Sequence, residues 1–234
     1  GGNSMLHTIQ AELFQLTRSK LFWIIEGLLF LLIFVSSFGE ANFSLYVSTP
    51  SGQDEIVRQG WTGFQALNQV AHDFLPFVMI AVLVLTTSLL GRDLTKKLYK
   101  NTLASGLSRK DFYLFKTATL TTTSLIQLAT VFVTAFILGS IFHGPGIMPK
   151  DFFENFSLSF FRAFVFIMAC SSAFACLLYL THSTLASYLI FFVLIMLQAS
   201  LHAIFPQLNS DFFTFLILAG SLWGGYQAFQ HRDL

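Results

Sequence analysis

The chain has 234 residues, of which 54% are hydrophobic and only 11% are charged, whereas about 25% of a typical soluble domain is charged. The formal net charge is +1 and no basic patch alternates with aromatic residues, so the sequence argues against nucleic-acid binding. Six apolar runs are each long enough to cross a ~30 Å hydrocarbon core as a helix. They lie near residues 21–38, 74–91, 118–141, 158–180, 185–204 and 212–229.

These runs predict an all-α polytopic membrane protein with six transmembrane helices. We expect residues 5–234 to form one transmembrane domain. The segment Gly1–Ser4 has the composition of a remnant of an expression tag, which makes Met5 the expected native start.

The N-terminal segment Leu6–Ser19 predicts an amphipathic helix ahead of the first span. Its apolar residues recur every three or four positions, which is the period of one helix face. They are Leu6, Ile9, Leu13 and Leu16. Such a helix can lie in the cytoplasmic membrane interface before the chain enters the bilayer. A short extension of the first transmembrane helix is the alternative.

Polar residues within the spans are few. Glu26 lies about one and a half turns into the first span, and acids within a membrane are expensive and often functional. Its place near the cytoplasmic edge allows a structural pair with water, Lys20 or a basic loop residue. A role in substrate passage or coupling is the alternative. Gln127 and Gln198 indicate hydrogen bonds between helices, with a translocation or coupling role also open.

The segment 39–72, between the first two spans, is long and mildly acidic. Its apolar residues suggest a helix that lies along the membrane surface, where Trp and other aromatics are favoured. They are Ile56, Val57, Trp61, Phe64, Leu67 and Val70. This helix either caps a translocation path or packs on the external rim.

The segment Arg92–Lys116 is the largest loop on the side that we assign to the cytoplasm. Leu94, Leu98 and Leu103 give one short helix an apolar edge. Gly106 can end this helix because glycine tolerates a left-handed cap conformation. A solvated basic loop that merely follows the positive-inside bias is the alternative.

The third span begins with a capping signal. Ser108 is followed three residues later by Asp111, which is close to a capping box with Asp in place of Glu or Gln. We therefore expect a new helix to begin after Ser108 and to continue into the membrane.

Basic residues fix the expected orientation, because Lys and Arg concentrate in cytoplasmic loops. Ten of the 13 lie on one side of six alternating spans: Arg18, Lys20, Arg92, Lys96, Lys97, Lys100, Arg109, Lys110, Lys116 and Arg232. The other three are Arg58, Lys150 and Arg162. Both termini are thus predicted to be cytoplasmic, in the plasma or inner membrane.

Several catalytic motifs are missing from the sequence. It has no phosphate-binding G-x-x-x-x-G-K-[ST] run, no H-E-x-x-H zinc helix and no G-x-S-x-G turn. We therefore expect no catalytic, cofactor or metal site in this chain. Internal repeats and charged span centres, typical of secondary transporters, are also not evident.

Two stretches carry a resemblance to a known family. They are ELFQLTRSKLFW (Glu12–Trp23) and GRDLTKKLYKNTLASGLSRKDFYLFK (Gly91–Lys116). With six spans and cytoplasmic termini, the chain resembles ABC-2 type permeases, the membrane subunits of small ABC exporters, over essentially its whole length. The resemblance implies a separate nucleotide-binding subunit that holds ATP and Mg²⁺, and a second permease copy that is identical or different.

The resemblance also implies a coupling helix within Asp93–Ser105 that docks on the ATPase. The contacts expected there are Leu94, Lys97, Leu98, Leu103, Ser105 and Arg109. Similar permeases export, or confer immunity to, lantibiotics, bacitracin-like peptides and amphipathic toxin peptides. The expected substrate is an amphipathic peptide or a lipid-like molecule. Two other classes of function are the alternatives. One is a six-span scaffold or sensor without transport, and the other is an intramembrane enzyme.

Overall fold

The computed structural model describes residues 2–38, 61–95, 108–204 and 210–231, with positions 100, 104 and 106 between them. Every regular element within these residues is a helix, which confirms the predicted all-α class. The elements are α1 (Gly2–Thr17), α2 (Lys20–Ser37), α3 (Gly63–Gln69), η1 (Val70–Phe74), α4 (Leu75–Thr86), η2 (Thr87–Gly91), α5 (Arg92–Thr95), α7 (Arg109–His143), α8 (Phe152–Thr181), α9 (Thr184–Ile204) and α10 (Ser210–Gln230).

The helices match the predicted spans closely. Within the described residues, five are long and apolar enough to cross a membrane: Lys20–Ser37, Leu75–Leu94, Arg109–His143, Phe152–Thr181 and Asp211–Gln230. The remaining span, predicted at 185–204, coincides with α9. Its described apolar stretch, Thr184–Ser200, is shorter than the other five, so the sixth crossing stays a prediction.

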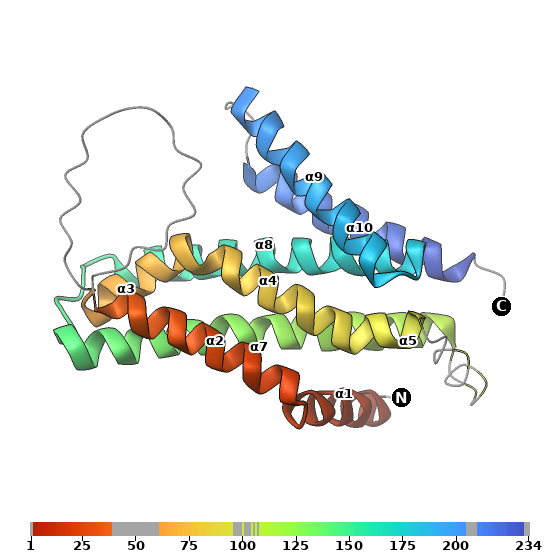
Figure 1. Ribbon diagram of the computed structural model, residues 1–234, viewed down its shortest axis with the longest axis horizontal. Helices are drawn as coiled ribbons and strands as arrows, with labels where there is room; N and C mark the ends of the chain where they lie inside the picture. The colour runs from red at the N-terminus through yellow and green to blue at the C-terminus, as the bar shows by residue number, and fades with distance from the viewer. Residues whose placement is uncertain are drawn as a thin grey trace.

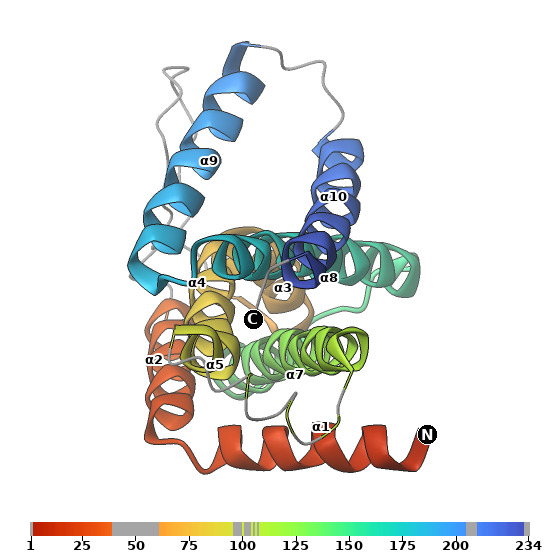
Figure 2. The same cartoon turned by 90° about the vertical axis from the view of Figure 1, so that its right-hand side faces the viewer.

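The long helices α7 and α8 run along the length of the molecule, with α4 packed on both and α2 packed on α7 (Figure 1). The helices α9 and α10 both pack on α8 and extend away from it on the same side (Figure 2). Gly225 lies where α10 meets α7 and α8, since a Cβ there would stand 3.3 Å from the Tyr113 Oη and 3.5 Å from the Cys176 Cα. Small residues commonly mark such contacts between membrane helices.

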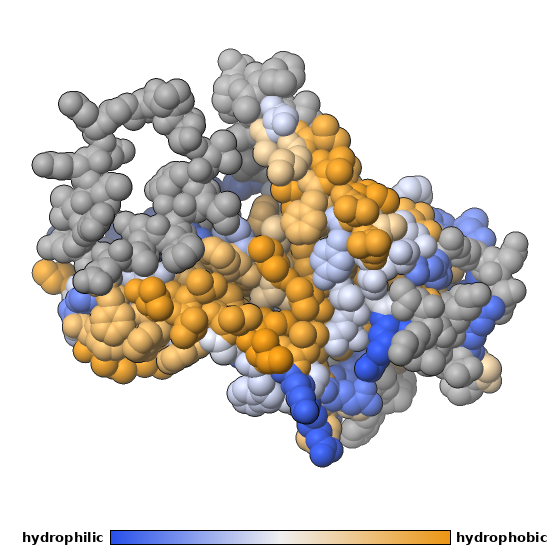
Figure 3. Space-filling model, in the orientation of Figure 1, coloured by the Kyte–Doolittle hydropathy of each residue, from blue (hydrophilic) through white to orange (hydrophobic). Residues whose placement is uncertain are grey.

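The outer surface of the bundle is largely apolar. Hydrophobic residues cover the centre of the face shown in Figure 3, and hydrophilic residues gather toward its right-hand end. Large apolar side chains are exposed along α2 and α9, among them Trp23, Leu28, Leu31, Leu189 and Val193. Exposure on this scale is typical of a surface that faces lipid or another protein.

The first helix, α1, is separate from α2 rather than an extension of it. The chain turns at Arg18–Ser19, where the Ser19 hydroxyl caps α2 by accepting from the Phe22 N–H. The Trp23 indole N–H donates to the Thr17 carbonyl over 2.8 Å and holds this corner. Viewed along α7 and α8, α1 runs crosswise beneath α7 (Figure 2). This direction agrees with the predicted amphipathic helix, and its place in the membrane interface stays a prediction.

At the opposite end of the bundle, α3 packs against the end of α7. The Gly63 and Phe64 N–H groups donate to the carbonyls of Gly144 and Pro145, over 3.0 and 3.1 Å. Trp61, Leu67 and Val70 are buried, so the described part of the predicted surface helix packs on this rim. Ile56 and Val57 lie outside the described residues.

Candidate functional site

A buried ion cluster joins three helices near the start of α7. The Lys116 ammonium pairs with the Glu12 carboxylate of α1, and with Asp93 Oδ2 of α5 at 2.7 Å. It also donates to the Leu89 carbonyl over 3.4 Å. An ammonium group has three N–H donors, so each finds an acceptor. The Lys116 side chain is only 7% exposed, against 20% for Glu12 and 24% for Asp93. We call these three residues the Lys116 junction.

The backbone before α5 supports this junction. The segment η2 (Thr87–Gly91) is a turn of π-helix, in which the wider winding changes which backbone groups pair. One of its carbonyls, from Leu89, accepts from Lys116. On its other side, the Thr87 hydroxyl lies 2.8 Å from the Tyr188 hydroxyl of α9. The chain that enters the predicted coupling segment is therefore held by α7 on one side and by α9 on the other.

The chain that leaves the coupling segment enters α7 as predicted. The Ser108 hydroxyl caps α7 by accepting from the Asp111 N–H over 3.1 Å, and donates to Asp111 Oδ2 over 2.7 Å. Gly106 has φ +96°, the left-handed region that glycine adopts most readily. The predicted cap at Ser108 and the left-handed conformation of Gly106 are therefore confirmed, whereas the helix that Gly106 was predicted to end lies mostly outside the described residues.

The predicted ATPase contacts have different outcomes. Leu94 is 0% exposed, so its place on an exposed apolar edge was wrong. The reason is helical spacing, because Leu94 follows Leu90 by four residues and shares its buried face. Arg109 is half-buried and donates to the Gln230 carbonyl of α10 over 2.9 Å. Four contacts lie outside the described residues: Lys97, Leu98, Leu103 and Ser105.

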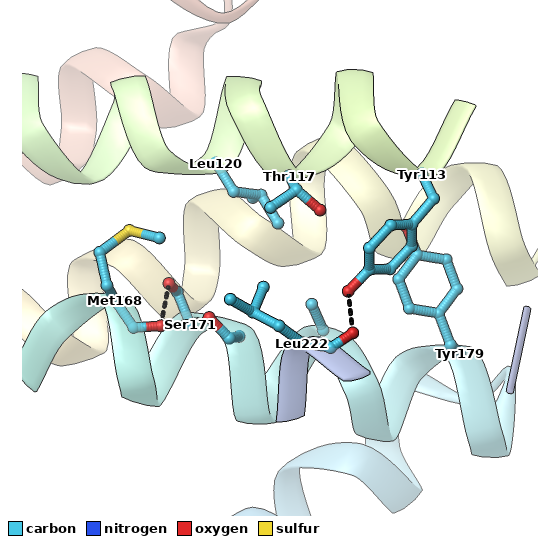
Figure 4. Close-up of a pocket in the computed structure, with 9 residues that line it drawn as sticks. Tyr113, Thr117, Leu120, Met168, Ser171, Tyr179 and Leu222 are labelled. Carbon is cyan, nitrogen blue, oxygen red and sulfur yellow. Dashed lines mark hydrogen bonds between the residues drawn. The ribbon is translucent and has the colours of Figure 1, made fainter. Parts of the chain in front are cut away.

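Aromatic side chains tie the start of α7 to α8 and α10. The Tyr113 hydroxyl donates to the Leu222 carbonyl over 2.6 Å, and its ring lies 5.5 Å from the rings of both Tyr179 and Tyr226. A narrow pocket beside Tyr113 is lined by hydroxyl groups as well as apolar side chains (Figure 4). The first turns of α7 thus contact five neighbouring elements, which are α1, η2, α5, α8 and α10.

Two of the predicted intramembrane polar residues come together. Glu26 of α2 lies beside Gln127 of α7, and no ion pair involves Glu26 among the described residues. Among the described residues, the side chain beside Glu26 is thus a neutral amide rather than the expected Lys20 or a basic loop residue, because α2 packs along α7. Gln198 is exposed on α9, which packs on α8, and it does not join this pair.

Two of the four apolar positions predicted for the interfacial face of α1 have described side chains, and these two differ in burial. Leu16 is 5% exposed and belongs to the core, whereas Leu13 is half-buried. The side chains of Leu6 and Ile9 lie outside the described part. The predicted apolar face of α1 therefore packs partly on the bundle, beside the Glu12–Lys116 pair.

Comparison with known protein families decides the class of this molecule. A model of the ABC-2 family transporter proteins matches residues 8–198, which is most of the chain. The chain belongs to the ABC-2 transporter family. Neither a curated protein nor a solved structure matches it. As an ABC-2 family member, it is a multi-pass membrane permease subunit of an ABC transporter.

The Lys116 junction connects α1, α5 and α7 through ion pairs. The sequence alone does not reveal this junction, because Lys116 has the features of a basic loop residue that sets the orientation in the membrane. A usable signal was present, since Lys116 lies between Phe112 and Leu120 on the face of α7 that is buried. A cation at such a position needs acid partners.

Proposed function

We propose that this permease is part of an ATP-driven exporter whose substrate is an amphipathic peptide or a lipid-like molecule. A separate nucleotide-binding subunit holds ATP and Mg²⁺, and two permease copies, identical or different, surround the path. Both termini and the coupling segment face the cytoplasm of the cell in the plasma or inner membrane. Membership of the ABC-2 family supports the partner and the transport class.

The Lys116 junction is the observation that carries the mechanism. The predicted coupling helix lies within Asp93–Ser105, and the described residues that flank it, in α5 and at the start of α7, belong to this cluster of contacts. Asp93 at the entry and the first turns of α7 at the exit both connect to Lys116. A partner that displaces the segment therefore acts on α1 through Glu12, and on α9 through Thr87.

The apolar character of the spans supports the proposed substrate class. A groove between α4, α8 and α10 is lined mainly by apolar side chains, including Leu75, Phe166 and Phe215. The ion pair of Arg162 and Asp211, with a 3.4 Å separation, lies in its wall. An apolar groove with one charged pair suits a molecule that has both an apolar and a polar face.

The proposal is tested by reconstituting the permease with its cognate P-loop ATPase in proteoliposomes. A fluorescently labelled cationic amphipathic helical peptide and a fluorescent phospholipid analogue serve as the two probes. We expect Mg²⁺- and ATP-dependent movement of one probe away from the ATPase side, and none when EDTA removes Mg²⁺. Tight ATPase binding without movement of either probe would favour a scaffold or sensor instead.

A further inference from the structure

The contact between α2 and α7 contains buried polar atoms without hydrogen-bond partners. They include Glu26 Oε1 and both polar side-chain atoms of Gln127, within the described residues. Gln127 is 1% exposed. The Ser124 hydroxyl, one turn away on the same face of α7, is also buried without a hydrogen-bond partner. Buried polar groups in proteins are nearly always paired, so the protonation state of this site decides whether its atoms can pair.

The charged groups of the surrounding helices do not neutralise Glu26. In α7 no ionisable residue lies between Lys116 and His143. Lys116 is 11 residues from Gln127, about 16 Å along the helix axis, and pairs with Glu12 and Asp93. The helix α4, which also packs on α2, has no ionisable residue. On α1, Glu12 faces Lys116, and Arg18, in the turn after α1, is exposed.

The numbers of hydrogen-bond donors and acceptors distinguish the ionised form of Glu26 from its protonated form. An ionised Glu26 only accepts hydrogen bonds, so it can use the amide N–H of Gln127 but leaves the amide oxygen without a donor. A protonated Glu26 has an O–H donor as well. Its O–H can donate to Gln127 Oε1 while Gln127 Nε2 donates to Glu26 Oε1. This closed arrangement pairs all three of the orphaned atoms.

We propose that Glu26 and Gln127 form a proton-binding site between α2 and α7, in which Glu26 holds one proton at neutral pH. The site does not depend on the exporter proposal, because it follows from the packing of two helices in one chain. Its proton links α2 to α7 within the membrane. Loss of the proton leaves a carboxylate with no counter-ion and loosens that contact.

Infrared spectroscopy of the purified permease in lipid tests the proton directly. The carbonyl band of a protonated carboxylic acid is separate from carboxylate bands and shifts in D₂O. We expect the wild type at neutral pH to show such a band that E26Q lacks. The matched control E154Q, at an exposed acid in the first turn of α8, should retain it. In Q127L the band should move, because the Glu26 carbonyl loses its N–H donor.

Thermal unfolding over a range of pH gives the second measurement. E26Q replaces the acid by an amide of the same shape, so it should fold and keep a stability that is insensitive to titration at this position. The wild type should match E26Q only at acidic pH, where Glu26 is protonated in the folded and the unfolded chain alike. As the pH rises above the ordinary carboxyl range, the unfolded chain ionises Glu26 first, so the wild type should lose stability relative to E26Q until the folded protein also releases the proton. An ionised Glu26 at neutral pH would overturn the proposal, as would stabilisation of the wild type, but not of E26Q, by Na⁺ or K⁺. A Glu26 band unchanged in Q127L would also overturn it.

Discussion

Replacement of Lys116 by Met tests whether the junction holds the N-terminal helix in place. Met keeps an unbranched apolar side chain and removes the charge, so Glu12 and Asp93 lose their shared cation. Loss of one partner of a buried pair costs about 3–5 kcal/mol. The two carboxylates are 20% and 24% exposed and can recruit some water, which places the cost near 3 kcal/mol on that scale. That free energy shifts the docking equilibrium of α1 by about 150-fold.

The effect should appear as a loosened α1 and as poorer coupling. Spin labels at Gln10 on α1 and at Leu114 on α7, both exposed, report the distance between the helices once the two native cysteines are replaced by alanine. We expect K116M to give a broader distance distribution than the Lys116 protein. In the complex with its ATPase, K116M should assemble but transport less probe for each ATP hydrolysed.

Two further variants isolate the cause. K150M makes the same change at an exposed lysine outside the junction and should alter neither measurement. The triple variant E12Q/D93N/K116M removes all three charges, so no carboxylate is left without a counter-ion. It should narrow the distance distribution again. A K116M protein with an undisturbed α1 and wild-type coupling would refute the argument that the junction transmits force.

Three other predictions follow from the proposed function. The chain alone should not hydrolyse ATP above background, and hydrolysis should appear with its P-loop partner in an enzymatic phosphate-release assay; turnover by the pure chain would contradict this. Leu98→Asp should weaken ATPase binding in a co-purification assay while membrane insertion stays normal, because a desolvated carboxylate without a partner is costly. The control Ser51→Asp should leave ATPase binding unchanged. A cysteine at Ser105 should react with impermeant thiol reagent only from the cytoplasmic side and one at Ser51 only from outside; the reverse pattern would overturn the topology.

The spans and the α7 cap could be predicted because their signals are local. A run of apolar residues determines a membrane helix whatever its neighbours are. The Ser108 cap likewise depends on one side chain and an N–H three residues away. The same holds for Gly106, whose φ of +96° reflects what glycine itself permits.

The contacts between distant segments could not be predicted in the same way. Glu12 and Lys116 are 104 residues apart, and only the packing of α1 beneath α7 selects that pair among the available charges. Leu94 is buried because it lies one turn after Leu90, and the burial of Leu90 itself depends on how η2 packs against α7 and α8. Sequence reasoning therefore identified Leu94 as apolar but assigned it to the wrong surface.

The contacts along α2 and α7 suggest which parts of the permease move together. Near one end, a His143 ring nitrogen lies 2.7 Å from the Ser37 carbonyl, and within the bundle Gln127 lies beside Glu26. At the Lys116 end, α1 and the corner held by Trp23 complete the connection. The two helices run in the same direction, as the first and third spans of an alternating topology must. We therefore expect α1, α2 and α7 to respond to the ATPase as one unit, with α8 linking that unit to α9 and α10.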